Sequence, residues 1–184
     1  VEEHTPLAKM VAAQKTADVD SGQQSRQFLL LMDQLEQAGY EHYEISNFAR
    51  PGHRSRHNSS YWSGAPYIGI GPSAHSFDGQ SRQWNVANNQ QYIAALQQQQ
   101  LPVTVEQLTP VQQINEYIMI SIRTAEGCNL NRVRNAMPDK WPLFEAGMQD
   151  CTARGWLLQQ DNMIRLTKEG KLFADRIAAT LFFE

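Results

Sequence analysis

The chain has few cysteines, no long apolar run and no excess of charge of either sign. Its two cysteines, Cys128 and Cys151, are too far apart for a C-x-x-C pair, so neither a disulfide framework nor a paired-cysteine metal site is expected. No run of eighteen apolar residues occurs, so no membrane-spanning helix is expected. A net charge of -3 and a pI near 6.0 give no electrostatic attraction to nucleic acid or an anionic membrane.

The first residues also lack an initiator methionine and a charged-then-apolar signal segment. They read Val1, Glu2 and Glu3. Without an export signal or a disulfide framework, the expected compartment is the reducing cytoplasm. The missing methionine leads us to expect that this chain is part of a longer protein.

The first hundred residues combine helical spacing with short strand-like stretches, as in α/β layers. One apolar helix face is predicted over residues 22–38 and is closed by Gly39. It consists of Phe28, Leu31, Met32 and Leu35. Aromatic and β-branched residues predict short strands at 40–46, 67–70 and 83–86, and a further helix is predicted over 88–100.

The pattern changes after Pro102, which cannot continue a helix, and we predict a domain boundary there. The two domains would comprise residues 1–102 and 103–184. In the second, helices are predicted near 110–123, 130–136 and 141–155, followed by a hairpin at 156–166 and a last helix after Thr167. Three helices and a hairpin predict a winged-helix-like domain.

Winged helices often bind DNA, but the charge of this domain disfavours that function. Residues 105–184 contain nine Lys or Arg and ten Asp or Glu, whereas a DNA-binding module normally has a basic face. Arg132 and Arg134 are the only local hint, and two such arginines are more typical of a solvated helix face. A packing or lid domain is the favoured interpretation, with a winged-helix interaction module as the alternative.

Residues 43–76 hold an unusual density of aromatic, histidine and glycine residues, punctuated by Pro and Gly pairs that predict loops. Within it, His57 and Asn58 are followed closely by Tyr61 and Trp62. A neutral imidazole can ligate a metal, and the two large rings can line the site of a planar ligand. The alternative is structural: Asn58 would cap a turn and Trp62 would fill the core.

The remaining histidines have different surroundings. His42 and His53 lie in or near predicted turns and are expected to be ordinary surface residues. His75 follows a stretch containing Gly69 and Gly71, where small residues let the backbone approach a ligand closely. This stretch has neither the G-x-G-x-x-G spacing nor the Lys-Ser/Thr of a phosphate-binding loop.

These segments resemble radical-SAM proteins related to oxygen-independent coproporphyrinogen III oxidase. The resemblance rests on YEISNFA (43–49), RHN (56–58), YW (61–62), YIGIG (67–71) and SAH (73–75), and continues through TAEG (124–127), GWL (155–157) and RLT (165–167) to Gly170. The H-N-x-x-Y-W element is similar to the haem-chaperone branch of that family. The resemblance implies an α/β architecture: the last strands and helices of an incomplete β/α barrel, followed by a helical C-terminal domain. Residues 1–7 resemble the end of a late barrel strand.

The resemblance also implies cofactors and a site. The family's [4Fe-4S] cluster, which requires a C-x-x-x-C-x-x-C motif, and its S-adenosylmethionine are expected only in the longer parent, because that motif is absent here. The parent is expected to bind haem and pass it to a recipient protein; the alternative is radical decarboxylation of coproporphyrinogen III. The chain by itself is expected to perform no radical chemistry. His57 is expected to ligate haem iron, beside Asn58, Tyr61 and Trp62, with Arg54 and Arg56 facing the propionates. Secondary candidates for the pocket are Tyr43, Gly69, Gly71 and His75.

Overall fold

The computed structural model describes residues 3–184 and begins with a helix that the sequence pattern did not predict. Helix α1 spans Pro6–Ala12, with the Thr5 hydroxyl accepting a hydrogen bond from the amide of Ala8 at 3.2 Å. It buries no residue, which explains the lack of an apolar period. Residues 3–7 therefore form a turn and a helix start instead of the expected strand end, and residues 1–2 lie outside the described part.

Helix α2 follows the prediction closely, whereas the single strand predicted at 40–46 is a hairpin of two strands. Helix α2 (Ser21–Gln37) starts where the Asp20 carboxylate accepts from the amide of Gln23 at 3.0 Å. Met32, on its apolar face, is buried. Strand β1 (Glu41–Glu44) pairs antiparallel with β2 (Asn47–Ala49), so the YEISNFA segment forms a tight hairpin.

The segment holding His57 is a helix, where the sequence predicted a loop. Helix α3 spans Arg56–Trp62, and the Ser55 hydroxyl accepts from the amide of Asn58 at 3.3 Å. Its residues are polar or aromatic and none is buried, so the sequence has no periodic apolar pattern there that would predict a helix. Asn58 is thus a residue of the first turn, and Ser55 is the cap.

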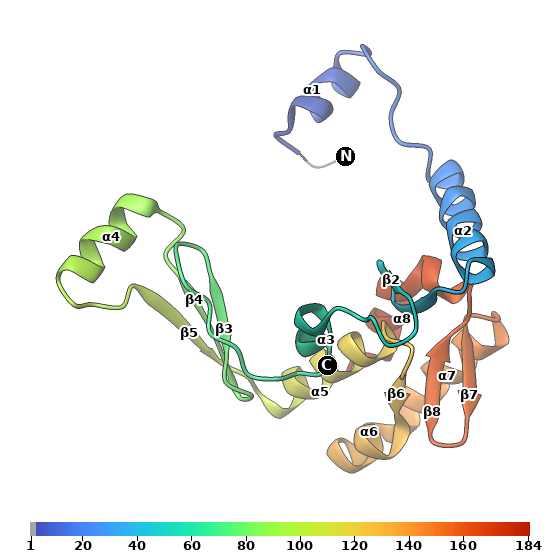
Figure 1. The fold of residues 1–184 in the computed structure, drawn as a ribbon. Helices are drawn as coiled ribbons and strands as arrows, with labels where there is room; N and C mark the ends of the chain where they lie inside the picture. Colours follow the sequence, from blue (N-terminus) through green and yellow to red (C-terminus); the bar gives the residue numbers. More distant parts are fainter. Residues whose placement is uncertain (1–2) are drawn as a thin grey trace.

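Strands β3 (His75–Phe77), β4 (Ser81–Asn85) and β5 (Val103–Gln107) form an antiparallel sheet in the order β3-β4-β5. Helix α4 (Asn89–Gln97) connects β4 to β5. We call residues 75–107 the arm, because they project from the rest of the molecule in Figure 1. The strand predicted at 67–70 is absent: Tyr67 alone bridges to Phe77, and no strand partner covers Ile68 and Ile70, which are 86% and 88% exposed.

Strand β5 lies on the far side of the domain boundary predicted after Pro102, yet it belongs to the arm. Its residues pair with β4 from Ser81↔Gln107 to Asn85↔Val103. A boundary at Pro102 would separate these two strands. The next buried residue, Leu108, follows directly after β5 and precedes the helix that starts the C-terminal part.

The C-terminal part contains the predicted helices and hairpin. In order they are α5 (Pro110–Ile122), β6 (Cys128–Asn129), α6 (Leu130–Ala136), η1 (Pro138–Lys140), α7 (Trp141–Ala153), β7 (Leu157–Gln160), β8 (Met163–Leu166), η2 (Gly170–Phe173) and α8 (Ala174–Leu181). The three strands form an antiparallel sheet in the order β6-β8-β7. All three sheets found among residues 3–184 are antiparallel, and the fold is mixed α/β.

The main hydrophobic core lies within this C-terminal part. Ile118, Phe144, Ile164 and Ile177 from α5, α7, β8 and α8 are each at most 1% exposed. Both cysteines are buried in the same core. Burial raises the pKa of the Cys128 thiol to about 11, so this side chain acts as a neutral packing group. None of the helices in the described range is both long and apolar enough to cross a membrane.

The β1–β2 hairpin attaches the N-terminal segments to this core. The amide of Ile45 donates to the carbonyl of Arg123 at 3.2 Å, and the amide of Ala125 donates to the carbonyl of Tyr43 at 3.1 Å. Helix α2 adds an ion pair between Asp33 and Lys168. The hairpin and residues 123–125 therefore join the N-terminal segments to the C-terminal part, and we call this contact the seam (Figure 1).

His42 lies at the same seam and is half-buried, whereas the sequence predicted an ordinary surface residue. Its ring stacks on Phe48 at 4.0 Å between centroids. Nε2 lies 2.9 Å from the carbonyl oxygen of Ile45, and Nδ1 lies 2.9 Å from Nζ of Lys171. Because the Lys171 ammonium can only donate hydrogen bonds, Nδ1 of His42 must accept one and carries no proton. The imidazole is therefore neutral, with its proton on Nε2. Burial lowers the pKa of His42, and the nearby charge of Lys171 lowers it further.

This lowered pKa predicts a loss of stability in mild acid. In the unfolded chain, His42 binds a proton as the pH falls through about 6.5, whereas in the folded protein it stays neutral there. The free energy of unfolding should therefore fall as the pH drops below about 6.5. The loss should end at the lowered pKa, with a slope of at most about 1.4 kcal/mol per pH unit for one proton. Urea unfolding between pH 7.5 and 5 measures it. His42→Phe keeps the ring and should flatten this part of the profile; an unchanged slope would contradict the assignment.

Candidate functional site

A cavity of about 570 Å³ lies between helix α3, the base of the arm and helix α5. This size falls within the range of pockets that hold small molecules and cofactors. Its aromatic walls are Tyr61, Trp62, Tyr67, Phe77 and Tyr117. Its polar lining includes Asn47, Asn58, Arg82, Gln113, Glu116, Ser121 and Arg132.

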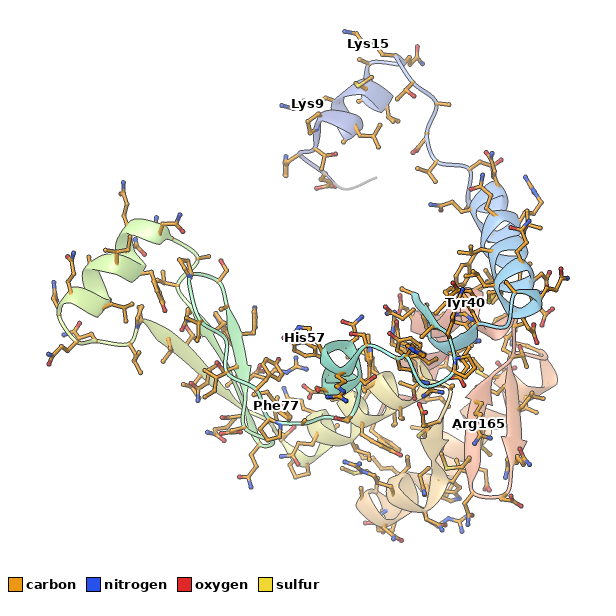
Figure 2. The ribbon with its side chains drawn as sticks, viewed as in Figure 1. Lys9, Lys15, Tyr40, His57, Phe77 and Arg165 are labelled. Carbon is orange, nitrogen blue, oxygen red and sulfur yellow. The ribbon has the colours of Figure 1, made fainter. Side chains whose placement is uncertain are left out.

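Three of the residues predicted for the site, Asn58, Tyr61 and Trp62, line this cavity. His57 does not line it, but its exposed ring meets the edge of Tyr61 at 5.0 Å between centroids. Tyr61 in turn meets Tyr67 at 4.9 Å, and Tyr67 meets Phe77 at 6.2 Å. Figure 2 shows His57 on α3 facing the strand that holds Phe77. A continuous run of rings therefore leads from the imidazole into the arm.

A hydrogen-bond relay from the β1–β2 hairpin fixes the position of Asn58. The buried carboxylate of Glu44 accepts from the amide of Ser46 at 3.0 Å and from Nδ2 of Asn47 at 2.6 Å. Oδ1 of Asn47 then accepts from Nδ2 of Asn58 at 2.9 Å. The YEISN and HN segments thus meet through side chains, and Asn58 holds helix α3 against the hairpin.

Arg123, at the end of helix α5, contacts Glu44 through an ion pair and not through a hydrogen bond. Its Nε lies 3.6 Å from Oε1 of Glu44, and its Nη1 lies 2.6 Å from a carboxylate oxygen of Asp175. Its guanidinium also stands 5.7 Å from the ring centre of Trp62. Trp62 is half-buried and lines the cavity; it is not part of the hydrophobic core that the structural alternative would have it fill.

The charged groups of the cavity come from three elements that are distant in sequence. Arg82 on β4 pairs with Glu116 on α5 at 2.7 Å. Arg132 on α6 lies 3.8 Å above the ring centre of Tyr117. Burial raises the pKa of Glu116, and the charge of Arg82 opposes that rise. Two guanidinium groups and one carboxylate leave the cavity with a net charge of +1 when all three are ionised.

The predicted propionate partners are placed elsewhere. Arg54 is paired with Glu41 at 3.1 Å and with Glu126 at 2.6 Å, and its guanidinium covers the buried ring of Tyr43 at 5.4 Å. Arg56 is exposed at the start of α3. Neither arginine lines the cavity, and Tyr43 serves the seam beneath Arg54.

Gly69, Gly71 and His75 lie at the arm and outside this cavity. A Cβ on Gly69 would stand 2.1 Å from the carbonyl oxygen of His75, so the close approach that was predicted there is made by the backbone of the chain itself. The amide of Gly71 donates to the hydroxyl of Tyr92 at 3.2 Å. His75 lies in a second, more open hollow of about 730 Å³, with Trp84.

The residues that the structure describes do not fit a [4Fe-4S] cluster. No three His, Cys, Asp or Glu side chains between residues 3 and 184 gather as a metal site requires. A [4Fe-4S] cluster needs several thiolates, whereas the two thiols here are buried in the C-terminal core.

Sequence reasoning missed the half of the cavity formed by other elements. Phe77, Arg82, Tyr117 and Arg132 come from β3, β4, α5 and α6 and belong to no local motif. Only tertiary packing brings them to helix α3. For Arg132, an available signal was its position as one of two arginines on a short helix, which was interpreted as a solvated face. Arg132 and Arg134 are both exposed, as that interpretation predicts, but each guanidinium also lies over an aromatic ring, Tyr117 and Trp141.

Several of the known proteins similar to this chain are named heme chaperone HemW. Heme chaperone HemW of Mycobacterium tuberculosis is 34% identical over 182 residues, which cover 98% of this chain and 45% of that protein. Heme chaperone HemW of Bacillus subtilis is 29% identical over 157 residues, which cover 84% of this chain and 41% of that protein. Among solved structures, the radical SAM enzyme coproporphyrinogen III oxidase, HemN, from Escherichia coli superposes with a TM-score of 0.65. It is 18% identical, covering 83% of this chain and 39% of that one.

No family model matches the chain. The chain spans less than half the length of the curated relatives that it matches. The HemN likeness shows the fold, and the sequence similarity over nearly the whole chain identifies the branch. The resemblance seen in the sequence is therefore confirmed: the chain belongs to the HemN-like radical-SAM proteins, in the branch whose members are named heme chaperones.

Proposed function

We propose that this chain contributes one wall of the haem-binding pocket of a haem chaperone, which passes haem to a recipient protein. The observation that carries the proposal is the cavity at helix α3, where Asn58, Tyr61 and Trp62 of the H-N-x-x-Y-W element line a space of about 570 Å³. The relatives named heme chaperones support haem as the ligand.

The chemistry of this cavity fits a tetrapyrrole. Tyr61, Trp62, Tyr67 and Phe77 offer flat apolar faces, which suit a planar macrocycle. The net positive charge suits a ligand with carboxylates. His57 presents an exposed imidazole beside Tyr61, and we propose that it ligates the iron.

The finer features of the fold are part of the same proposal. We infer that the N-terminal segments and the arm complete a β/α barrel with the rest of the protein, because Ile68 and Ile70 are exposed. The order α5, β6, α6, α7, β7, β8 supports a winged-helix domain, which we propose to begin at Thr109, after β5. We propose a cytoplasmic location. We propose no nucleic-acid ligand, because residues 105–184 have more acidic than basic side chains.

Haemin titration tests the role of His57. In the full-length protein, His57→Ala should weaken haemin binding by at least about tenfold and shift the Soret band, since an axial ligand is lost. His53→Ala is the matched control, because His53 is also exposed and its Nδ1 contacts only its own turn, 3.0 Å from the carbonyl oxygen of Pro51. Equal affinity and spectrum for wild type and His57→Ala would remove His57 from this role.

Product analysis separates the chaperone from the oxidase alternative. The likeness to coproporphyrinogen III oxidase is one of fold at 18% identity, so it supports no activity here. If the chaperone proposal is correct, the reconstituted full-length protein should form no vinyl-bearing product from coproporphyrinogen III. Formation of that product would favour the oxidase.

A further inference from the structure

Arg132 differs from the other arginines around the site because its charge faces the cavity without an acidic partner. Arg54 is held by Glu41 and Glu126, and Arg123 is held by Glu44 and Asp175. Among residues 3–184, the ion pairs of the structure include none for Arg132. Arg132 is exposed, and its guanidinium lies over the ring of Tyr117, 3.8 Å from the ring centre.

This stacking prepares Arg132 to bind an anion. Tyr117 is itself fixed, because its hydroxyl accepts from the amide of Asn129 at 2.9 Å. A guanidinium stacked on a fixed ring keeps its N–H fork in one plane, and that fork matches the two oxygens of a carboxylate. Less side-chain entropy is then lost when a carboxylate binds.

Arg82 offers a second guanidinium to the same cavity, from the arm. It is paired with Glu116 at 2.7 Å, so it can bind a ligand carboxylate only by leaving Glu116 or by sharing its donors. Glu116 is less exposed than Arg82, with side-chain exposures of 18% and 40%. The arginine is therefore the partner with more freedom to turn toward a ligand.

We propose that Arg132 binds one carboxylate of the ligand in this cavity, and that Arg82 binds the second by exchanging Glu116 for it. This inference rests on the proposed function and deepens it, because the two propionates of haem are such carboxylates. It assigns their recognition to β4 and α6, and not to Arg54 and Arg56 beside the H-N-x-x-Y-W element. Glu116 then opposes binding, since its carboxylate competes for Arg82 and repels the ligand.

A ligand without carboxylates provides the first test and needs no variant. Haemin and haemin dimethyl ester share the ring and the iron, so both are titrated into the wild-type full-length protein under identical detergent conditions. Haemin should bind about tenfold more tightly per carboxylate recognised, as expected for a charge-assisted pair. Equal affinities would overturn the assignment while leaving haem binding intact. Binding of neither ligand would overturn the assignment together with the proposed function.

Arg132→Met then locates the effect. It should weaken haemin about tenfold and leave the ester unchanged. Arg134→Met is the matched control, because Arg134 lies on the same helix and stacks on Trp141 at 4.3 Å but does not line the cavity. If Arg134→Met weakens haemin as much as Arg132→Met, the effect is one of general charge and the proposal fails.

Glu116→Gln tests the exchange at Arg82 as a gain of affinity. Removing the competing carboxylate should tighten haemin binding by about threefold to tenfold and leave the ester unaffected. A misfolded protein cannot produce such a gain. The gain should disappear in the double variant Glu116→Gln with Arg82→Met. Weaker haemin binding by Glu116→Gln, or a gain that persists without Arg82, would overturn the exchange.

Discussion

Replacing Glu44 with alanine is expected to lower the free energy of unfolding by about 3 kcal/mol, the low end of the range for breaking a buried ion pair. The Glu44 side chain is 1% exposed and serves Ser46, Asn47 and Arg123. Its loss leaves the Ser46 amide without its acceptor and the Arg123 guanidinium without its buried ion-pair partner. We expect the low end because Arg123 is 22% exposed and keeps Asp175. Urea unfolding at pH 7.5 measures the change.

Asp175→Ala is the matched control for this prediction. It removes a carboxylate from the same arginine, but the Asp175 side chain is 91% exposed. Exposed pairs contribute at most about 1 kcal/mol, so Asp175→Ala should stay below that value. If both variants cost the same, the buried position of Glu44 is not the cause. A loss below about 1 kcal/mol for Glu44→Ala would contradict the prediction directly.

Glu44 also shows how the family's sequence segments work together. It orients Asn47, which accepts the hydrogen bond from Asn58, while its other oxygen faces the arginine beneath Trp62. Side chains from the β1–β2 hairpin, from helix α3 and from the end of helix α5 therefore interact to hold the first turn of helix α3. Helix α3 spans only seven residues, and hydrogen bonds from Glu44 through Asn47 to Asn58 hold it against the hairpin.

Most of the helices predicted from the sequence bury an apolar face, and the two that were missed, α1 and α3, bury no residue. α2, α5 and α7 bury one side, which produces the 3.6-residue period. α1 and α3 bury nothing, so only their caps, Thr5 and Ser55, were available as signals. At 67–70 the β-branched residues predicted a strand, but a strand also needs a partner, and only Tyr67 has one.

The site was predictable only where its residues are neighbours in sequence. Asn58, Tyr61 and Trp62 lie within seven residues, so their chemistry stood out. Arg82 and Arg132 approach them through the packing of the arm and α6, which a local pattern does not encode. Arg54 was the natural choice for an anion partner by its place in the sequence. The structure pairs it with Glu41 and Glu126, which are 13 and 72 residues away.

Gly127→Ala is expected to cost about 3 kcal/mol, because two separate penalties meet at this residue. Its φ of +81° is a conformation that costs an L-residue about 1–2 kcal/mol. In addition, a Cβ would stand 2.3 Å from the carbonyl oxygen of Ile164, and such overpacking costs about 1–3 kcal/mol. Because Ile164 pairs with Cys128, relief of the contact would pull β6 from β8.

Gly155→Ala separates these two penalties. Gly155 has a similar φ of +73°, but a Cβ there would meet nothing within 4 Å. It should therefore cost only the conformational part, about 1 kcal/mol. The difference between the two variants, measured by urea unfolding, is the cost of the close approach between β6 and β8. Equal losses would mean that the sheet adjusts freely at Gly127, and that this glycine is required only for its backbone conformation.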